Sequence, residues 1–231
     1  MKSKQDLIWD LPLRLFHWLF AISILASWYT SEQEGEMIEL HMQLGYFILG
    51  LVIFRLIWGF AGTKHSRFSE FFPTPSKIIN YLRESETDHQ IKYAGHNPLG
   101  SLMVFLMILL IVLQAVSGLF INDDIFSSGP YYGILSAEME KTMTFIHHNT
   151  FNVMIGAIVM HVLAIVYYRL KMKTDLVTPM ITGKKSEYEI DSNDAISHSR
   201  LLAAIVIAIA VAAFVYWLVV INAPIEEEYF Y

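Results

Sequence analysis

Five long apolar runs constrain the fold more than any other feature of this sequence. They cover approximately residues 11–30, 42–61, 99–121, 146–169 and 201–221. At a helical rise of about 1.5 Å per residue, each run is long enough to cross roughly 30 Å of hydrocarbon. Only 16% of the 231 residues are charged, whereas about 25% is usual in a soluble domain. The sequence therefore predicts an all-α integral membrane protein with five spanning helices.

The charges between the runs predict the orientation of the chain. The second connection (62–98) and the fourth (170–200) are rich in Lys and Arg, whereas the first and third connections and the C-terminal tail "IEEEYFY" are acidic. Short basic loops stay in the cytoplasm. We therefore expect a cytoplasmic N-terminus and an external C-terminus. No basic face suggests binding to nucleic acid.

The first apolar run is interpreted as a helix of the mature protein. It carries Arg14 and His17 and shows no small-residue cleavage pattern, so it does not read as a signal peptide. The chain contains no cysteine. Disulfides, iron–sulfur clusters and haem attached through a CxxCH motif are therefore excluded, which leaves histidine, methionine and carboxylate ligands for a metal centre.

Four of the nine histidines lie inside or at the mouth of a predicted spanning helix, where an ionisable side chain is costly and usually functional. His17 and His161 have similar depths in the cytoplasmic half of the membrane, so they can share one ligand. His41 and His147 are expected to begin the second and fourth helices on the outer side, so they can share another. The other alternative is that these histidines satisfy hydrogen bonds between helices.

Helical phase favours the same pairs. The 14 positions from His147 to His161 fall about 40° short of four full turns, so both side chains project from one face of the helix. The 13 positions from His148 to His161 end about 220° beyond three full turns, so the side chain of His148 points away from that face. The two levels lie about 21 Å apart along the helix. That separation is too long for a metal ion chelated by protein alone. It suits two flat cofactors, each between two imidazoles, which is how bis-histidine haem b is held for one-electron transfer.

Small and basic residues near these histidines are candidate parts of the same sites. Gly45, Gly50 and Gly156 provide room for a flat group or, equally, for close helix packing. Arg14 and Arg55 lie toward the cytoplasmic ends of the first and second helices. They are candidate contacts of haem propionates or of quinone, and the alternative is that they are positive anchors at the membrane surface.

The chain resembles the bacterial cytochrome b561 and nickel–iron hydrogenase b-type cytochrome family. The resemblance covers roughly residues 7–185, and it runs through "WDLPLRLFHW", "LHMQLGYFILGLVIFRLIWGF", "RFSEFF", "GHNPLG", "HHNTFNVMIGAIVMHVLAIVYY" and "PMITGKK". It implies a four-helix transmembrane bundle in the bacterial inner membrane with two b haems. By motif, His17 and His161 would hold the cytoplasmic haem, and His41 and His147 the outer haem.

The resemblance also implies a division of the chain. We expect a cytochrome b561-type haem domain over residues 1–185, followed over 186–231 by a linker, a fifth transmembrane helix and an acidic periplasmic tail. In "GHNPLG", Asn97 before Pro98 is typical of a helix N-cap. His96 is a candidate contact of a haem propionate or of quinone, and a capping role at the membrane surface is the alternative.

These features together predict an electron-transfer subunit rather than a stand-alone enzyme, with no catalytic residue assigned. We expect electrons to pass between the quinone pool and a periplasmic partner, such as a cytochrome c or a dehydrogenase or hydrogenase-type subunit, and an oligomer is left open. One alternative is a superoxide:quinone oxidoreductase, which would need an electropositive outer funnel, and the outer loops are acidic. Another is a histidine-lined proton or metal transporter, which would tend to have charged residues or broken helices at mid-membrane.

Overall fold

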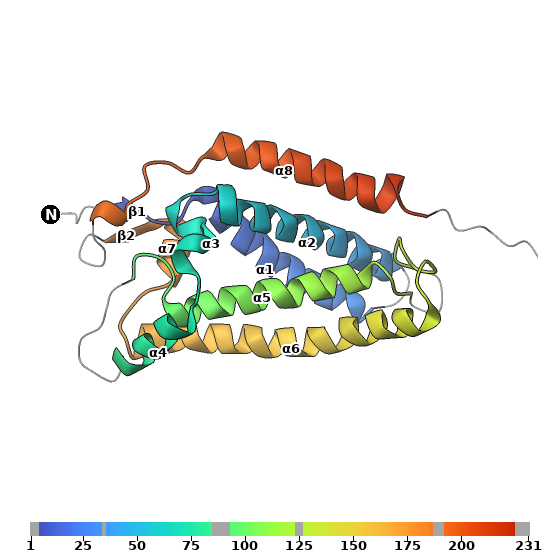
Figure 1. Cartoon of the computed structure of the whole chain (residues 1–231), viewed down its shortest axis with the longest axis horizontal. Helices are drawn as coiled ribbons and strands as arrows, with labels where there is room; N and C mark the ends of the chain where they lie inside the picture. Colours follow the sequence, from blue (N-terminus) through green and yellow to red (C-terminus); the bar gives the residue numbers. More distant parts are fainter. Residues whose placement is uncertain (1–4, 34–35, 85–92, 123–126, 187–191, 225–231) are drawn as a thin grey trace, which may run out of the picture. The chain divides into compact units, whose positions relative to one another are not determined.

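The computed structural model describes residues 5–33, 36–84, 93–122, 127–186 and 192–224 (Figure 1). The acidic tail considered above, residues 225–231, lies outside this part of the chain. Within it, five helices are long and apolar enough to cross a membrane, as the sequence predicts. They are α1 (Leu11–Ser31), α2 (Glu36–Ala61), α5 (Pro98–Gly118), α6 (Ala137–Leu170) and α8 (Leu201–Tyr216), which continues as the π-helical turn Trp217–Ile221.

Two of these helices begin earlier than the apolar runs predict. Helix α2 starts at Glu36 rather than near residue 42, and α6 starts at Ala137 rather than near residue 146. Their first turns carry acidic side chains, which stabilise a helix N-terminus but interrupt an apolar run. The expectation that His41 and His147 begin their helices was therefore wrong, because both residues lie inside them.

Short elements lie near the ends of the long helices. They are the helices α3 (Phe68–Phe71), α4 (Pro75–Glu84) and α7 (Val177–Thr182), the 3-10 turns Lys64–Ser66 and Ser192–Asp194, and the strands β1 (Gln5–Leu7) and β2 (Lys184–Ser186). Helix α4 lies in the second connection. The two strands pair in antiparallel fashion, with Leu7 opposite Lys184. Four long helices separate them in the sequence, and this even number agrees with both strands lying on one side of a membrane.

The chain divides into two compact units, which are described separately. The first consists of Met1–Trp18, Arg55–Ile108 and Ile155–Ile207, and the second of Leu19–Phe54, Leu109–Met154 and Ala208–Tyr231. His17 and His161 belong to the first unit, and His41 and His147 belong to the second. The long helices each contribute to both units, so one helix can carry a candidate ligand in each.

A buried carboxylate organises the first unit. Asp10 is fully buried and caps α1 by accepting a hydrogen bond from the main-chain N–H of Leu13 at 2.8 Å. It also accepts hydrogen bonds from Trp58 Nε1 at 3.2 Å, Thr63 Oγ1 at 2.5 Å and Ser66 Oγ at 2.5 Å. Burial of a charge is costly unless it is fully hydrogen-bonded. Asp10 therefore fixes the start of α1, seven residues before His17, against the end of α2 and the turn that follows it.

In the second unit, Gly50 packs against the fifth long helix. A β-carbon at Gly50 would lie 3.7 Å from Val215 and 3.9 Å from Val211, and both valines are buried on α8. Of the two alternatives for Gly50, the structure therefore shows helix packing. The end of the same helix is held by Tyr131, whose hydroxyl donates to the carbonyl oxygen of Leu218 at 2.9 Å.

Candidate functional site

The second unit brings His41 and His147 together. Their ring centres are 6.3 Å apart and their planes are inclined by 81°. His41 Nδ1 lies 2.8 Å from the carbonyl oxygen of Ser27, and His147 Nδ1 lies 3.0 Å from that of Gln114. Because a carbonyl oxygen only accepts hydrogen bonds, each Nδ1 carries the proton. The Nε2 lone pair of both rings is therefore left available for a metal.

The first unit brings His17 and His161 together. Their ring centres are 6.4 Å apart and their planes are inclined by 53°. Trp18 packs edge-on against His17, with ring centres 5.0 Å apart. His17 Nδ1 is buried, and among the residues that the structure describes it has no hydrogen-bond partner. This pair thus matches the other in spacing and differs from it in hydrogen bonding.

The spacing within both pairs suits two imidazoles that share one metal. With metal–nitrogen bonds of roughly 2 Å, two such rings on opposite sides of a metal have centres roughly 6 Å apart. There is room beside the His41–His147 pair for a flat group, because within the described residues nothing lies within 4 Å of a β-carbon placed at Gly45, one helical turn after His41. The space at Gly156 is also open, but Gly156 is exposed on α6. The described residues contain no group of three or more His, Cys, Asp or Glu side chains suited to a metal ion. The residues present therefore fit a planar metal cofactor held by two histidines.

The neighbouring histidine, His148, does not join either pair. It is exposed on α6, and its ring centre lies 6.1 Å from that of His147. Gly118 on α5 makes room for His147, since a β-carbon there would lie only 2.9 Å from Cε1 of the His147 ring. The sequence reasoning missed Gly118 and the residues that hold the rings of His41 and His147. The signal in the sequence was the pair of polar residues Gln114 and Ser117, which end an apolar stretch that begins after Ser101.

Both arginines predicted as cofactor contacts, Arg14 and Arg55, have a buried donor without a partner in the part of the chain that the structure describes. Arg55 is 2% exposed, donates through Nη1 to the carbonyl oxygen of Ser66 at 3.2 Å and lies 4.6 Å from the ring centre of Phe68. Arg14 donates through Nη1 to the carbonyl oxygen of Ile181. Within the described residues, Arg55 Nη2 and Arg14 Nε are buried without a hydrogen-bond partner. Unsatisfied cationic donors are costly, so both suit an anionic acceptor.

The motif "GHNPLG" places His96 and Asn97 just before α5. Asn97 Oδ1 accepts a hydrogen bond from the main-chain N–H of Gly100 at 2.7 Å, which confirms the predicted N-cap. Its Nδ2 donates to the hydroxyl of Tyr168 at 2.6 Å, and that hydroxyl lies 2.5 Å from the hydroxyl of Tyr81. Asn97 thus ties the start of α5 to α6 and α4.

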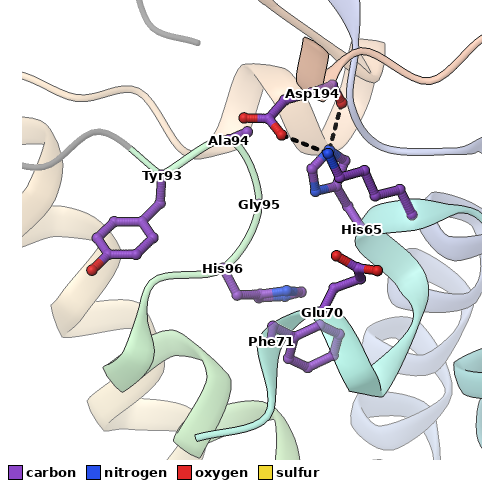
Figure 2. Close-up of a pocket in the computed structure, with 9 residues that line it drawn as sticks. His65, Glu70, Phe71, Tyr93, Ala94, Gly95, His96 and Asp194 are labelled. Atoms are coloured by element: carbon purple, nitrogen blue, oxygen red, sulfur yellow. Dashed lines mark hydrogen bonds and ion pairs between the residues drawn. The ribbon is translucent and has the colours of Figure 1, made fainter. Parts of the chain in front are cut away.

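His96 borders a pocket of about 160 Å³ in the first unit (Figure 2). The ring of His96 lies between those of Trp9 and Phe71, at 4.8 Å and 4.6 Å between centres. Its Nδ1 is buried and has no hydrogen-bond partner within the described residues. His65, on the opposite wall in Figure 2, donates through Nε2 to the carbonyl oxygen of Asp194 at 2.7 Å. The pocket is lined by Lys64, His65, Glu70, Phe71, Tyr93, Ala94, Gly95, His96 and Asp194.

Protonation of His96 is expected to destabilise the first unit at low pH. Burial, and then the positive charges of Arg55 and Lys185, lower the pKa of His96 from 6.5 to about 3. Between these two values the unfolded chain binds more protons at this site than the folded one, so stability falls as the pH falls from 6.5 toward 3. Thermal unfolding in detergent should become less pH-dependent over this range in His96→Gln. An unchanged pH dependence in the variant would contradict the assignment.

Comparison with known proteins connects these sites to a family. A family model described as prokaryotic cytochrome b561 matches residues 8–183. The chain belongs to this family. Membership implies a multi-pass membrane protein that carries haem b and takes part in electron transfer. The resemblance noted in the sequence is confirmed, and both histidine pairs fall within the matched region.

Individual relatives of this b561-family chain carry the name "Probable Ni/Fe-hydrogenase B-type cytochrome subunit". The one from Azotobacter vinelandii is 28% identical over 45% of this chain and 53% of its own length. Those from Cupriavidus necator and Rhodobacter capsulatus are 21% and 24% identical over 79% and 78% of this chain, and 88% and 80% of their own lengths. Against the Azotobacter vinelandii protein the chain thus spans about half of the relative's length.

Proposed function

We propose that this cytochrome holds two haem b groups, one between His17 and His161 and the other between His41 and His147. The observation that carries the proposal is the pair of ring-centre separations, 6.4 Å and 6.3 Å, each between histidines of two different helices. Open space beside Gly45, one turn after His41, supports the second of these sites. The sequence lacks cysteine, which leaves noncovalent binding as the way to hold haem.

The residues around each site hold the cofactor without taking part in bond chemistry. At each site two histidines would hold the haem iron, and the bound group would then serve one-electron transfer rather than oxygen binding. The unsatisfied donors of Arg14 and Arg55 would bind carboxylate groups such as haem propionates. When bound, haem supplies one-electron oxidation and reduction. We therefore infer that the protein itself spaces, orients and shields two redox centres.

We further propose that electrons pass between the quinone pool and a periplasmic redox subunit of the hydrogenase type. The printed names of the relatives support this partner. The basic second and fourth connections support an inner-membrane orientation with a cytoplasmic N-terminus and a periplasmic C-terminus. The unpartnered Nδ1 of His96 makes its pocket a candidate for quinone contact on the cytoplasmic side. The haem domain would occupy residues 1–185, and the fifth helix would follow it.

A reduced-minus-oxidised spectrum with haem quantification tests the cofactor proposal. The purified chain, produced with an adequate haem supply, should show b-type bands and bind two haems per chain. Protein without haem would contradict the proposal as a whole, and one haem per chain would contradict one of the two pairs. Reduction of the bound haem by a short-chain quinol in membranes is the corresponding test for quinone, and failure to reduce it would contradict that partner.

A further inference from the structure

The two histidine pairs differ in what their Nδ1 atoms contact. In the His41–His147 pair, each Nδ1 is bonded to a main-chain carbonyl oxygen, of Ser27 at 2.8 Å and of Gln114 at 3.0 Å. Two serine hydroxyls lie nearby, with Ser27 Oγ 3.1 Å from His41 Nδ1 and Ser117 Oγ 3.3 Å from His147 Nδ1. In the His17–His161 pair, the described residues offer no hydrogen-bond partner to the buried Nδ1 of His17. One pair is therefore anchored by acceptors and the other is not.

A hydrogen bond from Nδ1 changes the electronic character of an axial histidine. When a carbonyl oxygen accepts a hydrogen bond from Nδ1–H, the imidazole becomes more basic and its Nε2 donates more strongly to the metal. Stronger donation stabilises the oxidised iron relative to the reduced iron. The site of His41 and His147 should therefore have the lower reduction potential, and its rings should be held in a fixed orientation.

Fixed charges favour the same order of the two reduction potentials as the hydrogen bonds do. The first unit, which holds His17 and His161, also holds Arg14 and Arg55. The buried carboxylate of Asp10 offsets one of these two positive charges, and the remaining positive charge favours the state that has gained an electron. In the second unit, Glu39 precedes His41 by two residues on α2, and Glu138 and Glu140 occupy the first turn of α6. Negative charge favours the oxidised state. Two independent features thus predict the same order of potentials.

We propose that Ser27, Gln114 and Ser117 are positioning residues that give the haem held by His41 and His147 the lower reduction potential of the two. They act through the histidine rings and need not touch the cofactor. The inference rests on the proposed function, since it requires both haems. An electron at the His41–His147 site would then move energetically downhill to the His17–His161 site.

Potentiometric titration of single-site variants tests the order. His17→Ala should retain the haem of His41 and His147, and His41→Ala should retain the haem of His17 and His161. We expect the reduction equilibrium constant to be at least tenfold smaller in the first variant, which is about 59 mV for a one-electron couple. Equal potentials, or the reverse order, would overturn the inference. A failure of the proposed function would appear earlier and separately, as absence of haem from the wild-type chain.

Two further variants test the hydrogen bonds themselves in the wild-type background, so the test does not depend on the histidine variants. Ser27→Ala removes the hydroxyl that lies 3.1 Å from His41 Nδ1 and leaves the carbonyl acceptor of Ser27 in place, so its effect should be the smaller of the two. In Gly118→Ala the added methyl would lie 3.2 Å from Nδ1 of His147 and displace the ring from the carbonyl oxygen of Gln114. Each should raise the lower-potential wave and change the g-value spread of its ferric low-spin signal in electron paramagnetic resonance, while the higher wave stays in place.

Ser23→Ala is the matched control for Ser27→Ala. Ser23 lies one turn earlier on α1, and its hydroxyl donates to the carbonyl oxygen of Leu19 at 2.7 Å, within the helix. This control should leave both waves and both signals unchanged. A lower-potential wave that moves in neither Ser27→Ala nor Gly118→Ala would overturn the assignment of these positioning residues, as would an equal shift of both waves.

Discussion

Replacing any one of the four paired histidines with alanine is expected to remove one haem and leave the other. Alanine at His17 or His161 should empty the first unit's site, and alanine at His41 or His147 should empty the second's. Each haem depends on two axial bonds from two helices, and the remaining imidazole alone leaves an open iron position. Haem content, measured as the pyridine haemochrome per chain, should fall from two to one in each variant.

His148→Ala is the matched control for His147→Ala. The two residues are adjacent on α6, but His148 is exposed, and the ring that lies 6.3 Å from that of His41 is His147. We expect His148→Ala to retain two haems. The opposite result, with loss in His148→Ala and retention in His147→Ala, would show that the helical phase assigned to this segment is incorrect. Simultaneous loss of both haems in all four ligand variants would instead point to one cooperative site.

Replacing Asp10 with alanine is expected to destabilise the first unit strongly. The substitution removes the cap of α1 and leaves the buried donors of Trp58, Thr63 and Ser66 without their acceptor. It also leaves Arg55, which is 2% exposed, without the nearby carboxylate. Loss of one partner of a buried charged pair typically costs about 3–5 kcal/mol. The thermal unfolding midpoint in detergent should fall accordingly.

Asp194→Asn is the control for the loss of Asp10. Asp194 forms an ion pair with Lys64 at 2.8 Å, and the side chains of Lys64 and Asp194 are 38% and 34% exposed. Such surface pairs contribute about 0–1 kcal/mol, so this variant should change the midpoint little. If Asp10→Ala and Asp194→Asn lowered the midpoint equally, the buried cluster would not be the stabilising feature that its hydrogen bonds indicate.

The sequence was most informative where a property repeats along the chain. The lengths of the apolar runs predict the five long helices. The depth of each histidine in the membrane, combined with its position around the helix, predicts which histidines meet. Asn97 was predictable as a cap because capping depends on residues adjacent in sequence. The starts of α2 and α6 were not, since their first turns are acidic and fall outside an apolar window.

Features that depend on distant partners could not be predicted. Asp10 is an ordinary aspartate in the sequence, and its role becomes visible only when Trp58 and Thr63, which follow it by 48 and 53 positions, lie beside it. The acceptors of His41 and His147 are main-chain carbonyls, which every residue possesses. Strands of three residues are too short to show an alternating pattern, so β1 and β2 left no signal.

The pairing of β1 with β2 has a consequence for the synthesis of the protein. Leu7 is made 177 positions before its partner Lys184. At about 5–20 residues per second, roughly 10–35 s pass between the two. Throughout that interval β1 has no strand to pair with, because four long helices are made before β2. Strand β1 is therefore open to proteases and to wrong partners during that interval, and a ribosome that stalls before residue 184 releases a chain in which β1 cannot pair with β2.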